Sequence, residues 1–279
     1  MNAFRELLAA ARVTHVPGVH DPLSATLAVH AGHRAVYLSK NAVAAVMMGR
    51  PDVDYVPATQ IADRAATLAP VLDGVPLMAD AGAGFDTAQD AAWTALAYQR
   101  AGISALVLTD HDGGHVAAMA RQAPDVAVIA RTTAYATGGL DTAVERCRAY
   151  AKAGADAVLP AGVRTPEELF RLKAALPGVP LVLSRTEAGP AAPTLADADL
   201  AALGVRLVLH PLAALLAAVR AASQAYRSIA EDGSADDVER MPWAVFAALS
   251  AASTPGSSPR SSSGSPGGGD QPASASLGS

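Results

Sequence analysis

The chain has 279 residues, of which 51% are hydrophobic, 17% charged and 4% aromatic, and this composition suits one large α/β domain. A net charge of −5 without any Lys/Arg cluster argues against nucleic acid as a partner. No apolar run reaches the ~20 residues that span a bilayer, and the single Cys147 cannot form an internal disulfide, so we expect a cytoplasmic protein without membrane contact.

Short apolar β-type runs alternate with helical patterns along the whole chain. Residues 1–12 form an amphipathic helical pattern rather than a signal peptide, because Arg5 and Glu6 interrupt it. The expected strands are 15–18, 35–39, 76–80, 105–110, 126–131, 156–160, 180–184 and 205–210. The expected helices are 22–30, 42–48, 58–72, 88–100, a short helix after His115, 141–153, a helix started by Thr165-Pro166, 211–229 and 235–250.

This alternation predicts a parallel sheet with right-handed crossovers. Eight strands predict closure into a (β/α)8 barrel, with extra C-terminal helices. The rival is an open doubly wound sheet, but polar strand ends recur along the whole chain rather than at one switch point. We therefore expect a single barrel domain over residues 1–251, followed by a disordered Ser/Gly/Pro-rich tail at 252–279.

Five of the apolar runs end on a polar or charged residue. Because the carboxyl ends of barrel strands converge on one mouth, these residues are predicted to line one site. They are Ser39, Asp80, Asp110, Arg131 and Ser184.

Each of these residues also has a purely structural interpretation. Asp80 suits a helix cap or a loop hydrogen bond, Ser39 suits a cap on the next helix, and Arg131 suits an ion pair with Asp80 or Asp110. His111 and His115 flank a glycine turn that is more typical of a solvated loop than of a catalytic pair.

The order of several short segments resembles the isocitrate lyase/phosphoenolpyruvate mutase superfamily, on its methylisocitrate-lyase-like side. The resemblance spans about Val16 to Tyr226. The segments are PGVHDPLSA from Pro17, AVYLS from Ala35, GRPD from Gly49, ADAGAGF from Ala79, ART from Ala130, GLD from Gly139, AY at 149–150, AGADA from Ala153, TE at 186–187 and LHPL from Leu209.

The resemblance implies a phosphoenolpyruvate/pyruvate-type barrel and a Mg2+-dependent enzyme that makes or breaks a C–C or P–C bond through an enolate. It implies that Asp80 contacts the metal and that Asp52 holds metal-bound water. It also implies that Tyr37, Ser39, Arg131 and Thr186 bind the substrate carboxylate or oxyanion. A hard cation prefers oxygen ligands, and a developing enolate gains from a guanidinium already in place.

The chain departs from the family pattern at several positions. Gly82 replaces a metal-shell aspartate, Thr109 replaces a glutamate, and the loop that carries the lyases' catalytic cysteine is shortened to residues 111–115. Cys147 cannot substitute for that cysteine, because it sits within a helical pattern. We therefore do not expect this chain to cleave isocitrate or methylisocitrate as the family's lyases do, and we expect Mg2+ to bind weakly.

Three functions remain open from the sequence. The first is a divergent carbon–carbon lyase or decarboxylase acting on a small 2-oxo or 2-hydroxy carboxylate. The second is a catalytically degenerate barrel that binds a small acid or a protein partner, and the third is an isomerase or hydrolase that uses His111 or His115. The sparse aromatic residues Trp243 and Phe246, together with the resemblance, predict a homo-oligomer, either a dimer or a tetramer.

Overall fold

The computed structural model describes residues 2–50, 56–83, 85–185, 187 and 195–252 of the chain. The predicted tail, apart from Ala252, and the candidate residues Asp52 and Thr186 lie outside this described part. Residues Met1–Arg240 form one compact unit, and Met241–Ser279 belong to a second. The predicted domain limits, 1–251 and 252–279, remain predictions.

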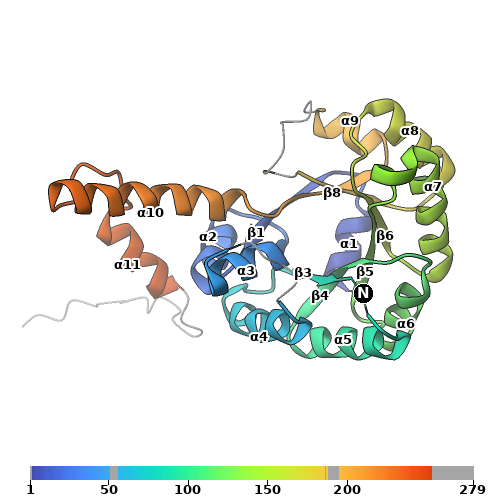
Figure 1. Cartoon of the computed structure of the whole chain (residues 1–279), viewed down its shortest axis with the longest axis horizontal. Helices are drawn as coiled ribbons and strands as arrows, with labels where there is room; N and C mark the ends of the chain where they lie inside the picture. The colour runs from blue at the N-terminus through green and yellow to red at the C-terminus, as the bar shows by residue number, and fades with distance from the viewer. Residues whose placement is uncertain (1, 51–55, 84, 186, 188–194, 253–279) are drawn as a thin grey trace, which may run out of the picture. The chain divides into compact units, whose positions relative to one another are not determined.

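Eight parallel strands close into a barrel in chain order, with each strand hydrogen-bonded to the next and β8 to β1 (Figure 1). The predicted (β/α)8 fold is confirmed. The strands are β1 (Thr14–Val19), β2 (Val36–Leu38), β3 (Leu77–Gly82), β4 (Ile103–Thr109), β5 (Ala127–Thr132), β6 (Ala157–Pro160), β7 (Leu181–Ser184) and β8 (Val205–His210). Their apolar sequences follow from burial on both faces, one in the barrel and one under helices.

Helices alternate with the strands along the chain, and most begin and end close to the predicted positions. They are α1 (Ala3–Ala9), α2 (Pro22–His30), α3 (Lys40–Met48), α4 (Ala58–Leu68), α5 (Ala88–Arg100), α6 (Gly114–Gln122), α7 (Tyr135–Ala153), α8 (Pro166–Ala175), α9 (Asp197–Ala202), α10 (Ala213–Asp232) and α11 (Trp243–Ala252). The helix start predicted at Thr165 is a capping box, because the Thr165 hydroxyl accepts from the Glu168 N–H and the Glu168 carboxylate accepts from the Thr165 N–H.

Three helix predictions need correction, and one helix was missed. The helix predicted at 235–250 starts only at Trp243, since Pro242 cannot donate a main-chain hydrogen bond and disfavours helix at the residue before it. α4 ends at Leu68, and a 3-10 turn carrying Pro70 follows it. α7 begins at Tyr135 and is interrupted at Gly139, where φ is +70°. The short helix α9 was not predicted.

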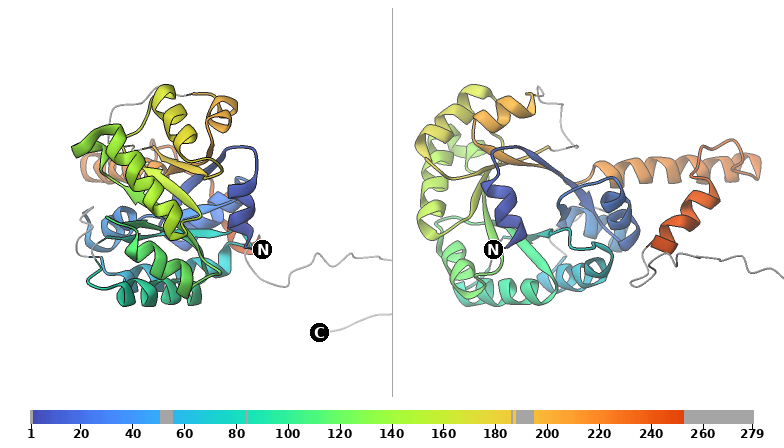
Figure 2. Two further views of the ribbon diagram at one scale, coloured as in Figure 1. Left: turned by 90° about the vertical axis from the view of Figure 1, so that its right-hand side faces the viewer. Right: turned by 180° about the vertical axis from the view of Figure 1, so that it is seen from behind.

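α1 closes the amino-terminal end of the barrel (Figure 2). Its buried Phe4, Leu7 and Leu8 belong to the same apolar cluster as the side chains inside the barrel. The Arg5 guanidinium forms an ion pair with Asp156 at 2.6 Å and donates to the main-chain carbonyls of Pro124 and Val126. These contacts seal the end of the barrel opposite the predicted site.

One glycine sets how closely β1 approaches the segment after β8. A Cβ added to Gly18 would lie 2.0 Å from the main-chain oxygen of Pro211, which no side chain can tolerate. Gly18 therefore permits the contact that brings the start of α10 to the mouth of the barrel. In the described part of the chain, no helix has both the length and the apolar character required to cross a membrane.

Candidate active site

A cavity of about 190 Å³ lies at the carboxyl ends of the barrel strands. The polar residues in its wall are Tyr37, Ser39, Asn41, Asp80, Arg131, Arg164, Ser184 and Glu187. This set includes four of the five strand-end residues that the sequence nominated. The exception is Asp110. Of the residues proposed from the resemblance, Tyr37, Ser39, Asp80 and Arg131 share this cavity, whereas Asp52 and Thr186 lie outside the described residues.

Asp80 and Tyr37 form a pair across two neighbouring strands, β3 and β2. The Tyr37 hydroxyl donates a hydrogen bond to the Asp80 carboxylate, and the Gly82 N–H donates to the same carboxylate at 2.8 Å. Burial raises the pKa of Asp80, while the Gly82 N–H, Arg131, Lys40 and Tyr37 oppose that shift. Burial and the nearby Asp80 charge raise the pKa of Tyr37 well above its ordinary value, so its hydroxyl stays a donor at neutral pH.

Arg131 is a half-buried guanidinium at the end of β5. Its charge stabilises ionised Asp80, but among the described residues it makes no ion pair within 4 Å with either Asp80 or Asp110. The structural ion pair weighed from the sequence is therefore not what the fold shows. A half-buried guanidinium without a close counter-ion in a cavity wall is suited to bind an anion.

Ser39 is buried, with 4% of its surface exposed, directly after β2. It occupies the N-cap position of α3, yet its side chain makes no cap hydrogen bond. The interpretation of Ser39 as a simple helix cap is therefore wrong. Its hydroxyl belongs to the cavity wall and is available as a donor to a ligand.

Asp110 does not line the cavity, which corrects the sequence prediction. Its carboxylate turns toward α6 and accepts from the N–H groups of His111 at 2.7 Å and Val116 at 3.1 Å. His115 Nδ1 lies 3.3 Å from the same carboxylate. Asp110 thus satisfies main-chain donors at the start of α6, and neither His111 nor His115 lines the cavity.

The remaining candidate nucleophile and histidines have structural environments. Cys147 is fully buried in α7, and burial raises the pKa of its thiol to about 12, so it does not form a reactive thiolate at neutral pH. His15 Nδ1 lies 3.0 Å from His210 Nε2, and His15 Nε2 lies 3.0 Å from an Asp197 oxygen. Both histidines therefore have partners within the fold.

Glu187, like Asn41 and Arg164, is a polar cavity residue that the sequence did not nominate. One of its carboxylate oxygens accepts from the Leu212 N–H at 3.3 Å. The other, Oε1, is buried and has no hydrogen-bond partner among the described residues. Such an oxygen is costly unless a ligand or water supplies a donor. The Thr186-Glu187 dipeptide was part of the resemblance, but only the fold shows that Glu187 faces this cavity.

The described residues do not by themselves form a metal centre. No group of three or more His, Cys, Asp or Glu side chains in the described part is arranged to hold a metal ion. At Gly82, where the family carries a second aspartate, the ammonium of Lys40 lies 2.9 Å from the place of a Cβ. The Mg2+ expected from the resemblance, bound by Asp80 and Asp52, remains a prediction.

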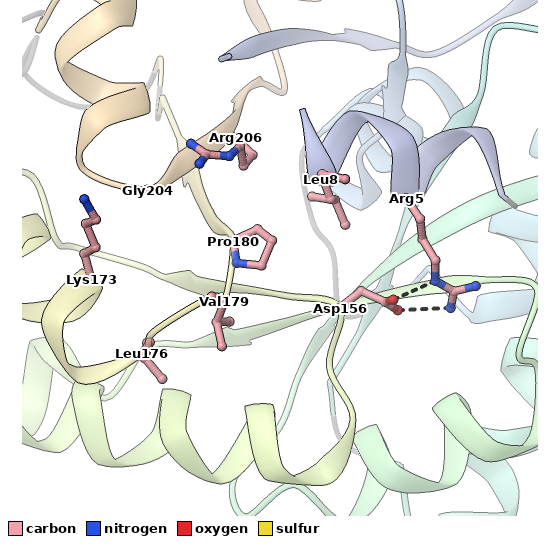
Figure 3. A pocket seen from close by; sticks show the side chains of 11 residues that line it. Arg5, Leu8, Asp156, Lys173, Leu176, Val179, Pro180, Gly204 and Arg206 are labelled. Atoms are coloured by element: carbon pink, nitrogen blue, oxygen red, sulfur yellow. Dashed lines mark hydrogen bonds and ion pairs between the residues drawn. The ribbon is translucent and has the colours of Figure 1, made fainter. Parts of the chain in front are cut away.

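A larger cavity of about 420 Å³ lies at the amino-terminal end of the barrel (Figure 3). Its charged side chains already have partners: Arg5 pairs with Asp156, Lys173 donates to the Ala202 carbonyl at 2.7 Å, and Arg206 donates to the Ala201 carbonyl at 2.9 Å. Lys173 and Arg206 thereby satisfy carbonyls at the end of α9. The smaller cavity is the better candidate, because chemistry in these barrels sits at the carboxyl ends of strands.

The chain is similar to known proteins over most of its length. The family model for phosphoenolpyruvate phosphomutase matches residues 4–230. The 2-methylisocitrate lyase of Bacillus subtilis is 34% identical over 250 residues, covering 83% of this chain and 82% of the relative. A crystal structure of 2,3-dimethylmalate lyase superposes with a TM-score of 0.81 at 28% identity, covering 90% of this chain and 96% of that one.

A second solved structure of similar fold contains a metal ion and a small acid. A phosphonopyruvate hydrolase in complex with oxalate and Mg2+ superposes with a TM-score of 0.78 at 30% identity, covering 90% of this chain and 94% of that one.

Proposed function

This chain belongs to the phosphoenolpyruvate mutase/isocitrate lyase superfamily, on its methylisocitrate-lyase-like side, and we propose that it cleaves or decarboxylates a small 2-oxo or 2-hydroxy carboxylate through an enolate. The relatives include carbon–carbon lyases, and the enzyme type follows from them. The observation that carries the substrate class is the half-buried Arg131 in the same small cavity as Asp80, Ser39 and Tyr37.

The size and charges of the cavity support a small acid. A volume of about 190 Å³ is below the roughly 300–1,000 Å³ of sites for drug-sized ligands. The Arg131 guanidinium can hold a carboxylate or enolate oxygen with two parallel N–H donors. The Ser39 hydroxyl can donate to a second oxygen of the same acid.

The chemistry requires negative charge to move onto the substrate when the bond breaks. In a retro-aldol cleavage, a base accepts the proton of the substrate hydroxyl while the carbon–carbon bond electrons form an enolate on the departing acid. Glu187 Oε1, which lacks a hydrogen-bond donor among the described residues, suits the acceptor role. Preorganised donors such as Arg131 and Ser39 stabilise the enolate oxygens as their charge develops.

Magnesium is part of this proposal only as an expectation from the relatives. A bound divalent ion would polarise an enolate oxygen. Asp80 is the described carboxylate that could contribute to holding it, whereas Asp52 lies outside the described residues. No step assigned above to Arg131, Ser39 or Glu187 depends on the metal.

A catalytically degenerate barrel that binds a small acid or a protein partner is the alternative. The replacement of a family aspartate by Gly82 and the lack of a three-carboxylate cluster among the described residues favour it. The shared cavity of Asp80, Arg131 and Glu187 favours turnover. Only an activity measurement separates binding without turnover from catalysis.

The test is an assay on a panel of 2-oxo and 2-hydroxy di- and tricarboxylates, with and without Mg2+, that detects pyruvate and glyoxylate by coupled reduction. We expect at least one acid to be cleaved or decarboxylated. Arg131→Lys should lower kcat/KM, and the fall should correspond to a loss of about 2–4 kcal/mol in transition-state stabilisation. Arg121→Lys, an exposed arginine on α6, is the matched control. Binding of an acid without turnover would support the degenerate barrel. No binding of any acid would refute both the proposed enzyme and the acid-binding form of the alternative.

A further inference from the structure

Lys40 is the first residue of α3 and follows Ser39 at the end of β2. Its side chain crosses to the end of β3. A Cβ placed on Gly82 would lie 2.9 Å from Lys40 Nζ, 3.3 Å from Cδ and 3.7 Å from Cε. The lysine stem thus occupies the space in which any side chain at position 82 would start.

Gly82 allows this position for two reasons. It lacks a Cβ, and its φ of +76° lies in the left-handed region that side chains rarely adopt. A side chain at position 82 would be strained by the left-handed backbone, and the Lys40 ammonium, the far end of a flexible side chain, would have to shift from its present place. Gly82 thus leaves room for the Lys40 ammonium beside the end of β3.

The location of Lys40 is electrostatically unusual. The amino terminus of a helix carries partial positive charge and favours anions, so a lysine at the first helical position is unfavourable there. No carboxylate in the described part of the chain lies within 4 Å of Lys40 Nζ. The nearby charge of Asp80 favours keeping Lys40 there, and Lys40 in turn favours ionised Asp80. A bound anion would offset the remaining cost.

We propose that the Lys40 ammonium, seated over Gly82 beside Asp80, supplies the positive charge that makes anion binding in the barrel-mouth cavity independent of a divalent metal. Arg131 then faces the anion from the cavity wall, and Lys40, which is not among the residues that line the cavity, acts on it through the charge beside Asp80. The inference rests on the proposed function, because it assumes that the cavity takes a small carboxylate. Lys40 is a positioning residue: it acts on the charge of the site, and no bond to it forms or breaks.

The experiment is calorimetric titration of oxalate, a stable planar mimic of an enolate, into the full chain in EDTA and again in Mg2+. Lys40→Met keeps the stem and removes the charge, and Lys40→Arg keeps the charge. Lys152→Met removes an exposed lysine on α7 and is the matched control. Thermal unfolding of each variant checks that the fold is kept.

For the unmodified chain, we expect oxalate Kd values that agree within about threefold between EDTA and Mg2+. Lys40→Met should weaken binding by about tenfold or more, the scale of one charge-assisted contact. Lys40→Arg should stay within about fivefold and Lys152→Met should not change. Rescue of Lys40→Met by Mg2+ would support the proposal further, since the ion would supply the missing charge.

Two outcomes would overturn the inference: oxalate binding that needs Mg2+ in the unmodified chain, or equal affinity of Lys40→Met and the unmodified chain. The comparison of oxalate binding in EDTA and in Mg2+ uses only the unmodified chain, so it remains valid even if Lys40→Met does not fold. Arg131→Lys separates the inference from the proposed function. If Arg131→Lys loses oxalate and Lys40→Met does not, only the role of Lys40 is wrong. If the unmodified chain binds no oxalate under either condition, both are wrong.

Discussion

The Tyr98 hydroxyl on α5 donates a 2.8 Å hydrogen bond to the main-chain carbonyl of Asp80 at the end of β3. A helix outside the barrel thereby anchors the strand end that carries the carboxylate of the site. The Tyr150 hydroxyl on α7 makes the equivalent contact to the Asp110 carbonyl. Both tyrosines are fully buried, and burial raises the pKa of each hydroxyl, so both remain donors at neutral pH.

Tyr98→Phe removes this anchor and leaves the Asp80 carbonyl without its partner. We expect a loss of about 1–3 kcal/mol in the free energy of unfolding, the cost of an unsatisfied buried acceptor. Oxalate affinity should fall as well, because the position of Asp80 becomes less fixed. Denaturant unfolding and calorimetry measure the two effects. Trp93→Phe, at an aromatic residue of the same helix that is 62% exposed, should change neither quantity.

Asp110→Ala and Asp80→Ala form a matched pair of strand-end substitutions. Asp110→Ala should destabilise the protein by about 1–3 kcal/mol, because the Val116 N–H loses its acceptor. Its oxalate affinity should not change, since Asp110 lies outside the cavity. Asp80→Ala should abolish the binding of Mg2+ together with oxalate and should change oxalate affinity, because Asp80 lies in the cavity. If Asp110→Ala keeps its fold but loses oxalate binding, Asp110 belongs to the binding site after all.

Glu187→Gln tests the carboxylate oxygen that lacks a partner. The amide keeps an acceptor for the Leu212 N–H and removes the charge, so the fold should be at least as stable. If Glu187 accepts the substrate proton, kcat should fall by a factor of roughly 100 or more. A variant with unchanged kcat on a cleaved acid would rule out this role. Ser223→Ala, at an exposed serine on α10, is the control.

The His15–His210 contact predicts loss of stability in mild acid. Burial lowers the pKa of His210 from its ordinary 6.5, and the neighbouring His15 lowers it further. The unfolded chain then binds more protons than the folded chain between the lowered value and 6.5, so stability falls as pH drops through this window and is retained above it. Melting temperatures at about pH 7.5 and about pH 5.5 measure the effect.

His210→Gln should reduce this pH dependence, because the group that resists protonation is gone. His30→Gln, an exposed histidine at the end of α2, should leave the dependence as it is. An unchanged pH profile in His210→Gln would assign the acid sensitivity to other groups.

Exposed apolar residues on α10 bear on the predicted homo-oligomer. Leu216, Val219, Tyr226 and Ile229 are each between 46% and 73% exposed, and their spacing places them on one face of the helix. Such a face is typical of subunit contacts. We expect a dimer or tetramer by multi-angle light scattering, and a shift toward the 28.1 kDa monomer in Val219→Asp/Tyr226→Glu. Gln224→Asp, on the opposite face, should not shift the mass. A monomer at micromolar concentration would contradict the prediction.

The sequence alone was enough to predict the barrel and the strand-end residues that share the candidate cavity. Strand and helix periods are local properties, and parallel strands that close in order must place their carboxyl ends together. Ser39, Asp80, Arg131 and Ser184 therefore reached one cavity as expected. Helix limits were less accurate where Pro70, Gly139 and Pro242 changed the backbone.

Contacts between distant segments were decided only by the tertiary structure. Asp110 lies at the end of a strand, as Asp80 does. Its carboxylate, however, accepts a hydrogen bond from the Val116 N–H at the start of α6. The Lys40 ammonium covers Gly82 because β2 and β3 are neighbours in this register, with Leu38 opposite Ala79. Where a side chain finds its partner depends on which backbone groups the closed barrel brings near it, and no local pattern encodes that choice.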